Sequence, residues 1–322
     1  MSLRYCRRWS YISSVHRTRY VVTDKGAPVA IDPGSTVPRR QLGRYLRELR
    51  EEARITVKAA AEELEWSAPK IWRIESGATS MRALDVEAMC KVYGAAPEIT
   101  QVLIGLARET KAKGWWHSYG DVIPVWFELY VGLESAASRI RQYEPELITG
   151  SLQTEAYARE VFRVAHPEMT DAEIERGVMV RLERQTLLTR KRPLAPQLDV
   201  VVNEAALRRP VGGHAAMAEQ LRHVNEVADL PNVSVRVLPL SAGLHHAAMT
   251  GGSFVILDFP TNGAHPEPST VYSEGLTGAL YLDKPQEIAA YNEVWANLAP
   301  SCLTEPQSKK LIAATAKEFR SP

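Results

Sequence analysis

The side chains whose types and spacing best suit a chemical task lie in one stretch, TVKAAAEELEWSAPKIWRIESG at residues 56–77. In its second half, cations follow a small-residue start: Ala68 and Pro69 precede Lys70 and Arg73. A narrow helix end with hydrogen-bond donors behind it is what a protein needs to enter the major groove of DNA and reach base edges. The pattern therefore predicts a DNA-reading helix.

The candidate contacts fall into two groups. The first group lies on this helix, where Lys70 and Arg73 would contact bases or nearby phosphates and Ser67 would bond a phosphate as well as cap the helix. Its members are Ser67, Ala68, Pro69, Lys70, Trp72 and Arg73. The second group consists of cations predicted to contact only phosphates, namely Lys58, Arg44 and Arg47.

Two short helices joined by a tight turn must position these side chains. Thr56 is a suitable N-cap for the first helix, and Ser67 with Pro69 in the following turn opens the second. Ile71 and Ile74 mark the buried face of the second helix, and Gly77 supplies a stop. The alternative interpretation is a plain helical hairpin inside a helical enzyme.

The same residues resemble the helix-turn-helix of the Xre and phage-repressor family. The matching positions are Ile55, Thr56, Ala60, Ala61, Ser67, Ile71 and Ile74 to Gly77. Val57 stands where the family often has a glutamine that braces against a phosphate. The resemblance implies a lambda-repressor-like bundle of helices, which binds double-stranded DNA as a homodimer.

The length of 322 residues and the positions of helix-breaking Gly and Pro residues divide the chain into several regions. We predict a flexible basic extension (1–37), a DNA-binding helical bundle (38–113), a hinge (114–124) and a C-terminal domain (125–322). The extension also fits a transit peptide or a phosphate-tracking arm, but a segment upstream of the usual start is favoured. Beyond residue 124, helices alternate with strands, which predicts a mixed α+β domain.

Bulk properties fit this organisation. The formal charge is +7 over residues 1–113 and −6 over 114–322, as expected if the front of the chain meets a polyanion. The three cysteines, Cys6, Cys90 and Cys302, lie far apart and favour a reducing compartment. No apolar run approaches the ~20 residues that a membrane helix needs. We therefore expect a cytoplasmic, nucleoid-associated protein without a membrane partner.

A second resemblance covers the C-terminal region. Residues 148–154 (ITGSLQT), Tyr157-Ala158, the run RLERQ at 181–185 and the run VYSE at 271–274 are similar to motifs of actinobacterial WhiJ-like regulators. Thr149 and Ser151 replace the family's Pro and Leu in the first motif. The resemblance implies a C-terminal domain that receives a signal or binds a small partner protein encoded nearby.

Candidate chemistry in this region is limited. Arg181, Arg184 and Gln185 share or neighbour one helix face and would either clamp an anionic ligand or pair with acids such as Glu204 and Glu274, the second being favoured. The adjacent His245 and His246 invite a metal site, but no ligand spacing supports one. We expect no metal, no cofactor and no catalytic residues.

The sequence thus predicts a dimeric, sequence-specific transcription regulator rather than an enzyme. The alternative is an antitoxin-like interaction module, whose main role is to bind a small protein encoded nearby.

Overall fold

The computed structural model describes residues 36–109, 125–250, 252–260, 267–275 and 278–320, and every structural statement below concerns these residues. The predicted extension, apart from its last two residues, and the predicted hinge lie outside this range. The boundaries predicted for the two main regions stay predictions.

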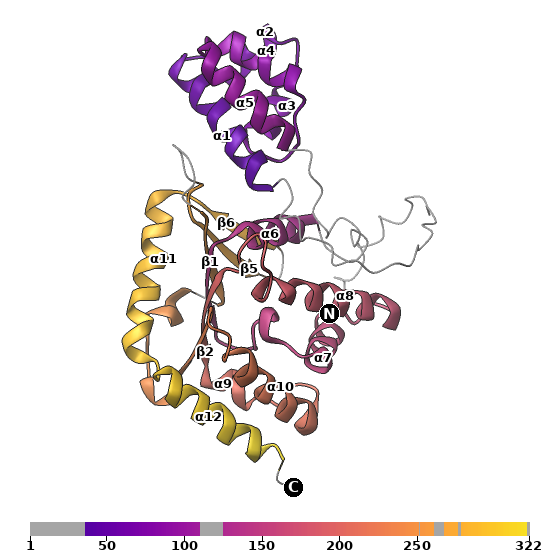
Figure 1. Ribbon diagram of the computed structural model, residues 1–322, viewed down its shortest axis with the longest axis vertical. Coiled ribbons are helices and arrows are strands. Elements are labelled where there is room, and N and C mark those ends of the chain that lie inside the picture. The colour runs from indigo at the N-terminus through magenta and orange to yellow at the C-terminus, as the bar shows by residue number, and fades with distance from the viewer. Residues whose placement is uncertain (1–35, 110–124, 251, 261–266, 276–277, 321–322) are drawn as a thin grey trace, which may run out of the picture. The chain divides into compact units, whose positions relative to one another are not determined.

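The N-terminal region consists of helices, drawn in indigo to purple in Figure 1. They are α1 (Thr36–Glu52), α2 (Val57–Glu63), α3 (Ala68–Glu75), α4 (Ala83–Tyr93) and α5 (Pro97–Glu109). The Thr56 hydroxyl accepts a hydrogen bond from the Ala59 amide at 3.1 Å, so it caps α2 as predicted. Buried leucine, isoleucine and methionine side chains, among them Leu46, Ile71 and Met89, form the core of this region.

Two features hold α3 against α1. A Cβ added to Gly43 would lie 2.5 Å from the carbonyl oxygen of Ile74, so only glycine permits this approach of the two helices. Nearby, the Arg50 guanidinium donates two hydrogen bonds to the Glu75 carboxylate, at 2.7 Å (Nε–Oε1) and 2.8 Å (Nη2–Oε2). Both side chains are buried. The position and tilt of α3 are therefore fixed from α1.

The helical period of residues 81–93 predicts that Leu84, Ala88 and Val92 point inward, and for Leu84 this is wrong, because 71% of it is exposed. The buried residues are Val86, Met89, Cys90 and Tyr93 instead. Their spacing of three and four residues forms a complete helical stripe, and Leu84 lies outside it in the first turn.

The C-terminal domain is built on one six-stranded sheet, in the order β3-β2-β1-β4-β5-β6. Its strands are β1 (Arg139–Glu144), β2 (Gln197–Asn203), β3 (Val233–Leu238), β4 (Phe254–Asp258), β5 (Thr270–Gly275) and β6 (Gly278–Leu282). The first three strands are parallel to one another, whereas β4, β5 and β6 each pair antiparallel with their neighbours. The predicted fold, a helical bundle followed by a mixed α+β domain, is confirmed.

Helices cover both faces of the sheet (Figure 1). They are α6 (Val125–Ala136), α7 (Glu155–Ala165), α8 (Asp171–Gln185), α9 (Glu204–Arg208), α10 (Gly213–Val227), α11 (Pro285–Leu298) and α12 (Glu305–Glu318). Side chains alternate along each strand. On β1, Ile140 joins the core packed against α6, α10 and α12, while Tyr143 joins the core under α11.

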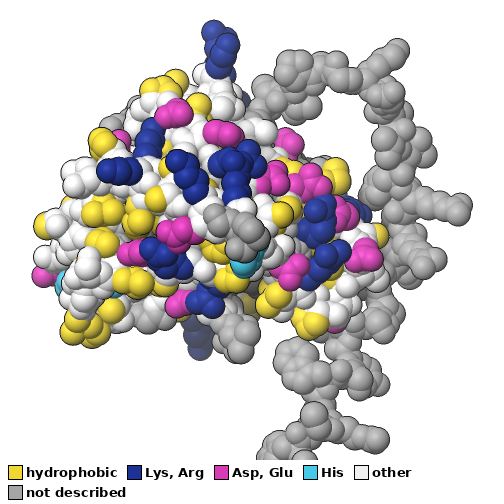
Figure 2. Space-filling model, turned by 90° about the horizontal axis from the view of Figure 1, so that it is seen from below, with side chains coloured by type: hydrophobic (Ala, Val, Ile, Leu, Met, Phe, Trp, Pro, Cys, Tyr) yellow, Lys and Arg dark blue, Asp and Glu magenta, His cyan; other side chains and the backbone are white. Residues whose placement is uncertain are grey.

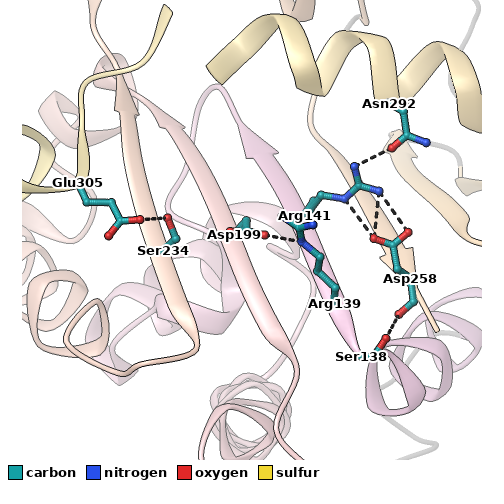
Figure 3. Close-up of polar contacts among 8 residues, drawn as sticks. All are labelled: Ser138, Arg139, Arg141, Asp199, Ser234, Asp258, Asn292 and Glu305. Carbon is teal, nitrogen blue, oxygen red and sulfur yellow. Dashed lines mark hydrogen bonds and ion pairs between the residues drawn. The ribbon is translucent and has the colours of Figure 1, made fainter. Parts of the chain in front are cut away.

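Strand β1 is the centre of the sheet and the place where its direction changes. It pairs in parallel with β2 and antiparallel with β4. On the α11 side, the two arms of Arg141 hold Asp258 across the β1–β4 pair, and Arg141 also donates to Asn292 of α11 (Figure 3). These bonds fix the antiparallel half of the sheet to the parallel half.

Most elements follow the sequence pattern, including the Thr170 capping box of α8. Helix α9 was not predicted, because five residues carry too little periodicity. No helix among the described residues is long and apolar enough to cross a membrane.

Candidate nucleic-acid interface and C-terminal cavity

The two sides of α3 differ sharply in burial. Ile71 and Ile74 are 0% and 3% exposed and pack into the helical core. On the other side Trp72 is 63% exposed, and Arg73 is exposed as well. The helix therefore presents a polar and aromatic surface while its isoleucines hold it in place, as a DNA-reading helix must.

The two predicted reading cations are in different situations. Among the described residues, none forms a hydrogen bond or an ion pair with the Arg73 side chain beyond α3 itself. Lys70 is engaged: its Nζ lies 3.2 Å from the centroid of the Trp66 ring and 3.7 Å from Asp85 Oδ1. The Arg73 side chain is therefore exposed and unengaged, whereas Lys70 is held by Trp66 and Asp85.

The start of α3 is exposed, and its insertion into a groove stays a prediction. Ser67 occupies the N-cap position, yet its side chain makes no capping hydrogen bond. Ala68 and Pro69 follow it, and both are exposed. The Ser67 hydroxyl is thus available to a phosphate, next to the helix amides that attract anions.

The three predicted phosphate contacts also differ. Lys58 is 86% exposed at its side chain, 3.9 Å from Glu62. Arg47 donates to the carbonyl oxygen of Glu75 at 3.0 Å, and Arg44 donates to Glu267 at 3.0 Å. Lys58 is therefore the best of the three, because the two arginines already have acceptors.

Sequence reasoning missed the residue pair that supports this surface. Glu75 lies in the quoted motif, and Arg50 lies 25 positions before it. No local pattern links the two residues, since the pair forms only when α1 and α3 pack.

Figure 2 shows another face of the molecule, on which Lys and Arg side chains are scattered among Asp and Glu. The described part of that face carries no continuous basic patch.

In the C-terminal domain, the predicted group on α8 divides between two roles. Arg184 donates from Nε and Nη2 to Glu134 of α6, both at 2.8 Å. Gln185 donates to the carbonyl oxygens of Gly150 and Gln153. Both side chains bond other residues of the domain, and the acid paired with Arg184 is Glu134 rather than the predicted Glu204 or Glu274.

The third member of the group, Arg181, lines a cavity of about 520 Å³. The cavity lies at the carboxyl end of β1, between that strand and helices α6, α7 and α8. Its polar lining includes Glu144 and Glu274, at the ends of β1 and β5. Burial raises the pKa of Glu144 to about 7 and lowers that of Arg181 to about 10. Sequence reasoning did not select Glu144, because it ends an ordinary strand.

The predicted histidines lie elsewhere. His245 packs edge-on against Tyr143, which belongs to the core under α11, whereas Arg181 lines the cavity on the other face of the sheet. Burial lowers the pKa of His245, and His246 is exposed. The structure therefore brings neither histidine into one site with Arg181.

Family comparisons agree with this division of the chain. Residues 41–102 match the model of a helix-turn-helix domain. Residues 127–314 match the model described as a domain of unknown function, DUF5753, which is more than half of the chain. The chain belongs to the DUF5753 family. No curated protein and no solved structure matches it.

The helix-turn-helix domain in front of the DUF5753 domain indicates DNA binding and transcription regulation. It points to a regulator rather than to an enzyme. Within the described residues of the DUF5753 domain and of the helical region, no group of three His, Cys, Asp or Glu side chains is arranged to hold a metal ion.

Proposed function

We propose that the protein is a sequence-specific transcription regulator of the Xre type, which binds DNA as a homodimer and receives a signal through its DUF5753 domain. One observation carries the DNA-reading part of this proposal. Arg73 and the Ser67 hydroxyl are exposed and uncommitted on a helix whose opposite side is anchored in a core.

In this proposal α3 enters the major groove. Arg73 contacts a base edge, and Ser67 with Lys58 contacts phosphates on the strands beside the groove. Lys70 exchanges its contact with Trp66 for a phosphate or a base. Trp72 packs on the sugar and backbone. Two copies read a two-fold operator.

The test measures binding of the full-length protein to promoter DNA from its own gene neighbourhood, over a series of salt concentrations. Arg73→Ala should reduce the preference for the operator over scrambled DNA by about tenfold or more, since a good base contact contributes about 1–3 kcal/mol of discrimination. An unchanged preference would contradict the assignment of Arg73.

Two controls separate the kinds of contact. Lys58→Ala should weaken binding to all sequences alike and reduce the salt slope by about one. Lys310→Ala removes the same charge from an exposed position of α12 and should leave both the preference and the slope unchanged.

A further inference from the structure

The cavity at the carboxyl end of β1 contains three charged side chains, Arg181, Glu144 and Glu274, which form no hydrogen bond or ion pair with one another in the described chain. In three other arginines of this protein, the Nε–Nη2 side of the guanidinium, here called the fork, is occupied by a carboxylate. In Arg50, Arg141 and Arg184, Nε and Nη2 together donate to both oxygens of one carboxylate, at distances of 2.7 to 3.2 Å. Such bidentate pairs are the strongest hydrogen bonds that arginine makes.

Arg181 departs from this pattern. Its Nη1 donates to Gln153 Oε1 at 2.6 Å, on the side away from the fork. Its Nε is buried and has no hydrogen-bond partner among the described residues. The guanidinium rests 4.6 Å from the ring of Phe162, which lines the same cavity. An open fork beside an open volume is suited to a carboxylate that comes from outside the chain.

The two carboxyl groups of the cavity, on Glu144 and Glu274, have no bond from a charged donor. Glu144 accepts a hydrogen bond from the Gln142 amide at 2.7 Å, and Glu274 accepts one from the Tyr272 hydroxyl at 2.8 Å. Both donors are neutral. In contrast, Glu134 and Glu75 each have an arginine on both oxygens. Arg181 faces both carboxyl groups but bonds neither, so a cationic group in the cavity would supply the direct contact that Glu144 and Glu274 lack.

The rest of the lining is apolar and aromatic, and Phe127, Tyr130, Val161 and Phe162 come from the two covering helices α6 and α7. A volume of about 520 Å³ lies within the range of sites for small molecules. The cavity lies at the carboxyl end of β1, the strand where the sheet changes from parallel to antiparallel pairing.

We propose that this cavity binds a small hydrophobic zwitterion, whose carboxylate lies on the Nε–Nη2 fork of Arg181 and whose ammonium group lies beside Glu144 and Glu274. A free hydrophobic amino acid and a hydrophobic dipeptide share this chemistry. The inference deepens the proposed function, because it names the class of signal that the DUF5753 domain would receive.

The test uses the full-length protein without DNA and measures binding by titration calorimetry. The probes are L-phenylalanine, L-leucine and the dipeptide Leu-Phe, together with 3-phenylpropionate, which lacks the ammonium group, and 2-phenylethylamine, which lacks the carboxylate. We expect at least one zwitterion to bind with a Kd below about 1 mM, and both single-charge probes to bind at least tenfold more weakly. The tightest zwitterion distinguishes an amino acid from a peptide ligand.

Variants then assign the charges. Arg181→Gln should weaken the zwitterion by at least tenfold, whereas Arg163→Gln, an exposed arginine of α7 that does not line the cavity, should not. Glu144→Gln keeps the shape of the side chain and should also weaken binding of the zwitterion. This variant therefore still tests the site if Arg181→Gln fails to fold.

The proposal is overturned if no zwitterion binds, if 3-phenylpropionate binds as tightly as L-phenylalanine, or if neither Arg181→Gln nor Glu144→Gln affects binding. DNA binding by the ligand-free protein is measured separately. If the protein binds its operator but none of the probes, the proposed ligand is wrong and the proposed DNA binding is unaffected. If it binds a zwitterion but not its operator, the proposed DNA binding is wrong and the ligand assignment is unaffected.

Discussion

The buried pair of Arg50 and Glu75 shows how single residues fix α3, the helix proposed to read DNA. Glu75 ends α3, and the fork of Arg50 fixes it from α1. Removing one partner of a buried ion pair leaves an uncompensated charge, which costs more than the pair itself contributes.

The first prediction follows from this pair. Glu75→Gln should lower the free energy of unfolding by about 3–5 kcal/mol, measured by urea denaturation of the full-length protein. The matched control is the double variant Arg50→Met with Glu75→Leu, which removes both charges and should recover most of the loss. If the single variant is as stable as the wild type, the buried pair does not hold α3.

Glu144 gives a prediction about pH. Burial raises its pKa to about 7 from an ordinary value of 4.5, and Gln142, Glu274 and Arg181 are the groups that face it. Because the folded protein keeps this proton to a higher pH than the unfolded chain, Glu144 contributes stability that is complete below about pH 4.5 and lost as the pH rises through 7.

Between pH 5 and 7.5, we therefore expect the wild type to lose on the order of 1–3 kcal/mol of stability through this group. Glu144→Gln should remove that part of the slope, in urea unfolding curves recorded across the range. Glu146→Gln, at an exposed acid two positions away, is the control and should leave the slope unchanged. Parallel curves for Glu144→Gln and the wild type would contradict the assigned shift.

At the scale of elements, the approach of α1 and α3 depends on the absence of a side chain at Gly43. A Cβ there would meet the backbone carbonyl of Ile74 at 2.5 Å, and backbone cannot move aside as a side chain can. Gly43→Ala should therefore destabilise the protein by about 1–3 kcal/mol and weaken operator binding, because α3 must shift.

Gly105→Ala is the matched control for this change. Gly105 lies within α5, and nothing within 4 Å would meet its added Cβ. This substitution should stabilise the helix by about 0.5–1 kcal/mol, as measured by thermal unfolding. Equal effects of the two substitutions would show that the contact between α1 and α3 is not tight.

The elements themselves were largely predictable, for reasons that differ between helices and sheet. The bounds of β1 and α11 follow from local alternation and from Pro285 at the helix start, and both agree with the structure. The pairing of β1 with β2 and with β4 was not predictable, because it depends on contacts between segments more than 50 residues apart. For the same reason, the charges of the cavity could not be grouped from the sequence.

The candidate site was predictable to the extent that it lies on one helix. The exposure of Arg73 and the burial of Ile71 and Ile74 follow from helical period alone. The engagement of Lys70 does not, since Trp66 lies before the helix and Asp85 lies on α4. Long-range partners thus decide which cations stay free.

At the scale of the whole molecule, the proposed dimer makes a geometric prediction. Two copies of α3 on a two-fold axis read half-sites about 10 base pairs apart, or a multiple of one DNA turn. Inserting five base pairs between the half-sites should reduce affinity to near the level of scrambled DNA, and inserting ten should restore part of it, in gel-shift titrations. Equal binding to all spacings would indicate that one copy binds alone.

The change from parallel to antiparallel pairing at β1 has a consequence for the order in which the parts of the protein are completed during synthesis. The floor of the cavity needs Gln142 and Glu144 from one half of the chain, and Tyr272 and Glu274 from the other. A ribosome that adds about 5–20 residues per second completes α3 roughly 10–40 s before it adds Glu274. A nascent chain therefore contains the helix-turn-helix region well before the residues that complete the cavity.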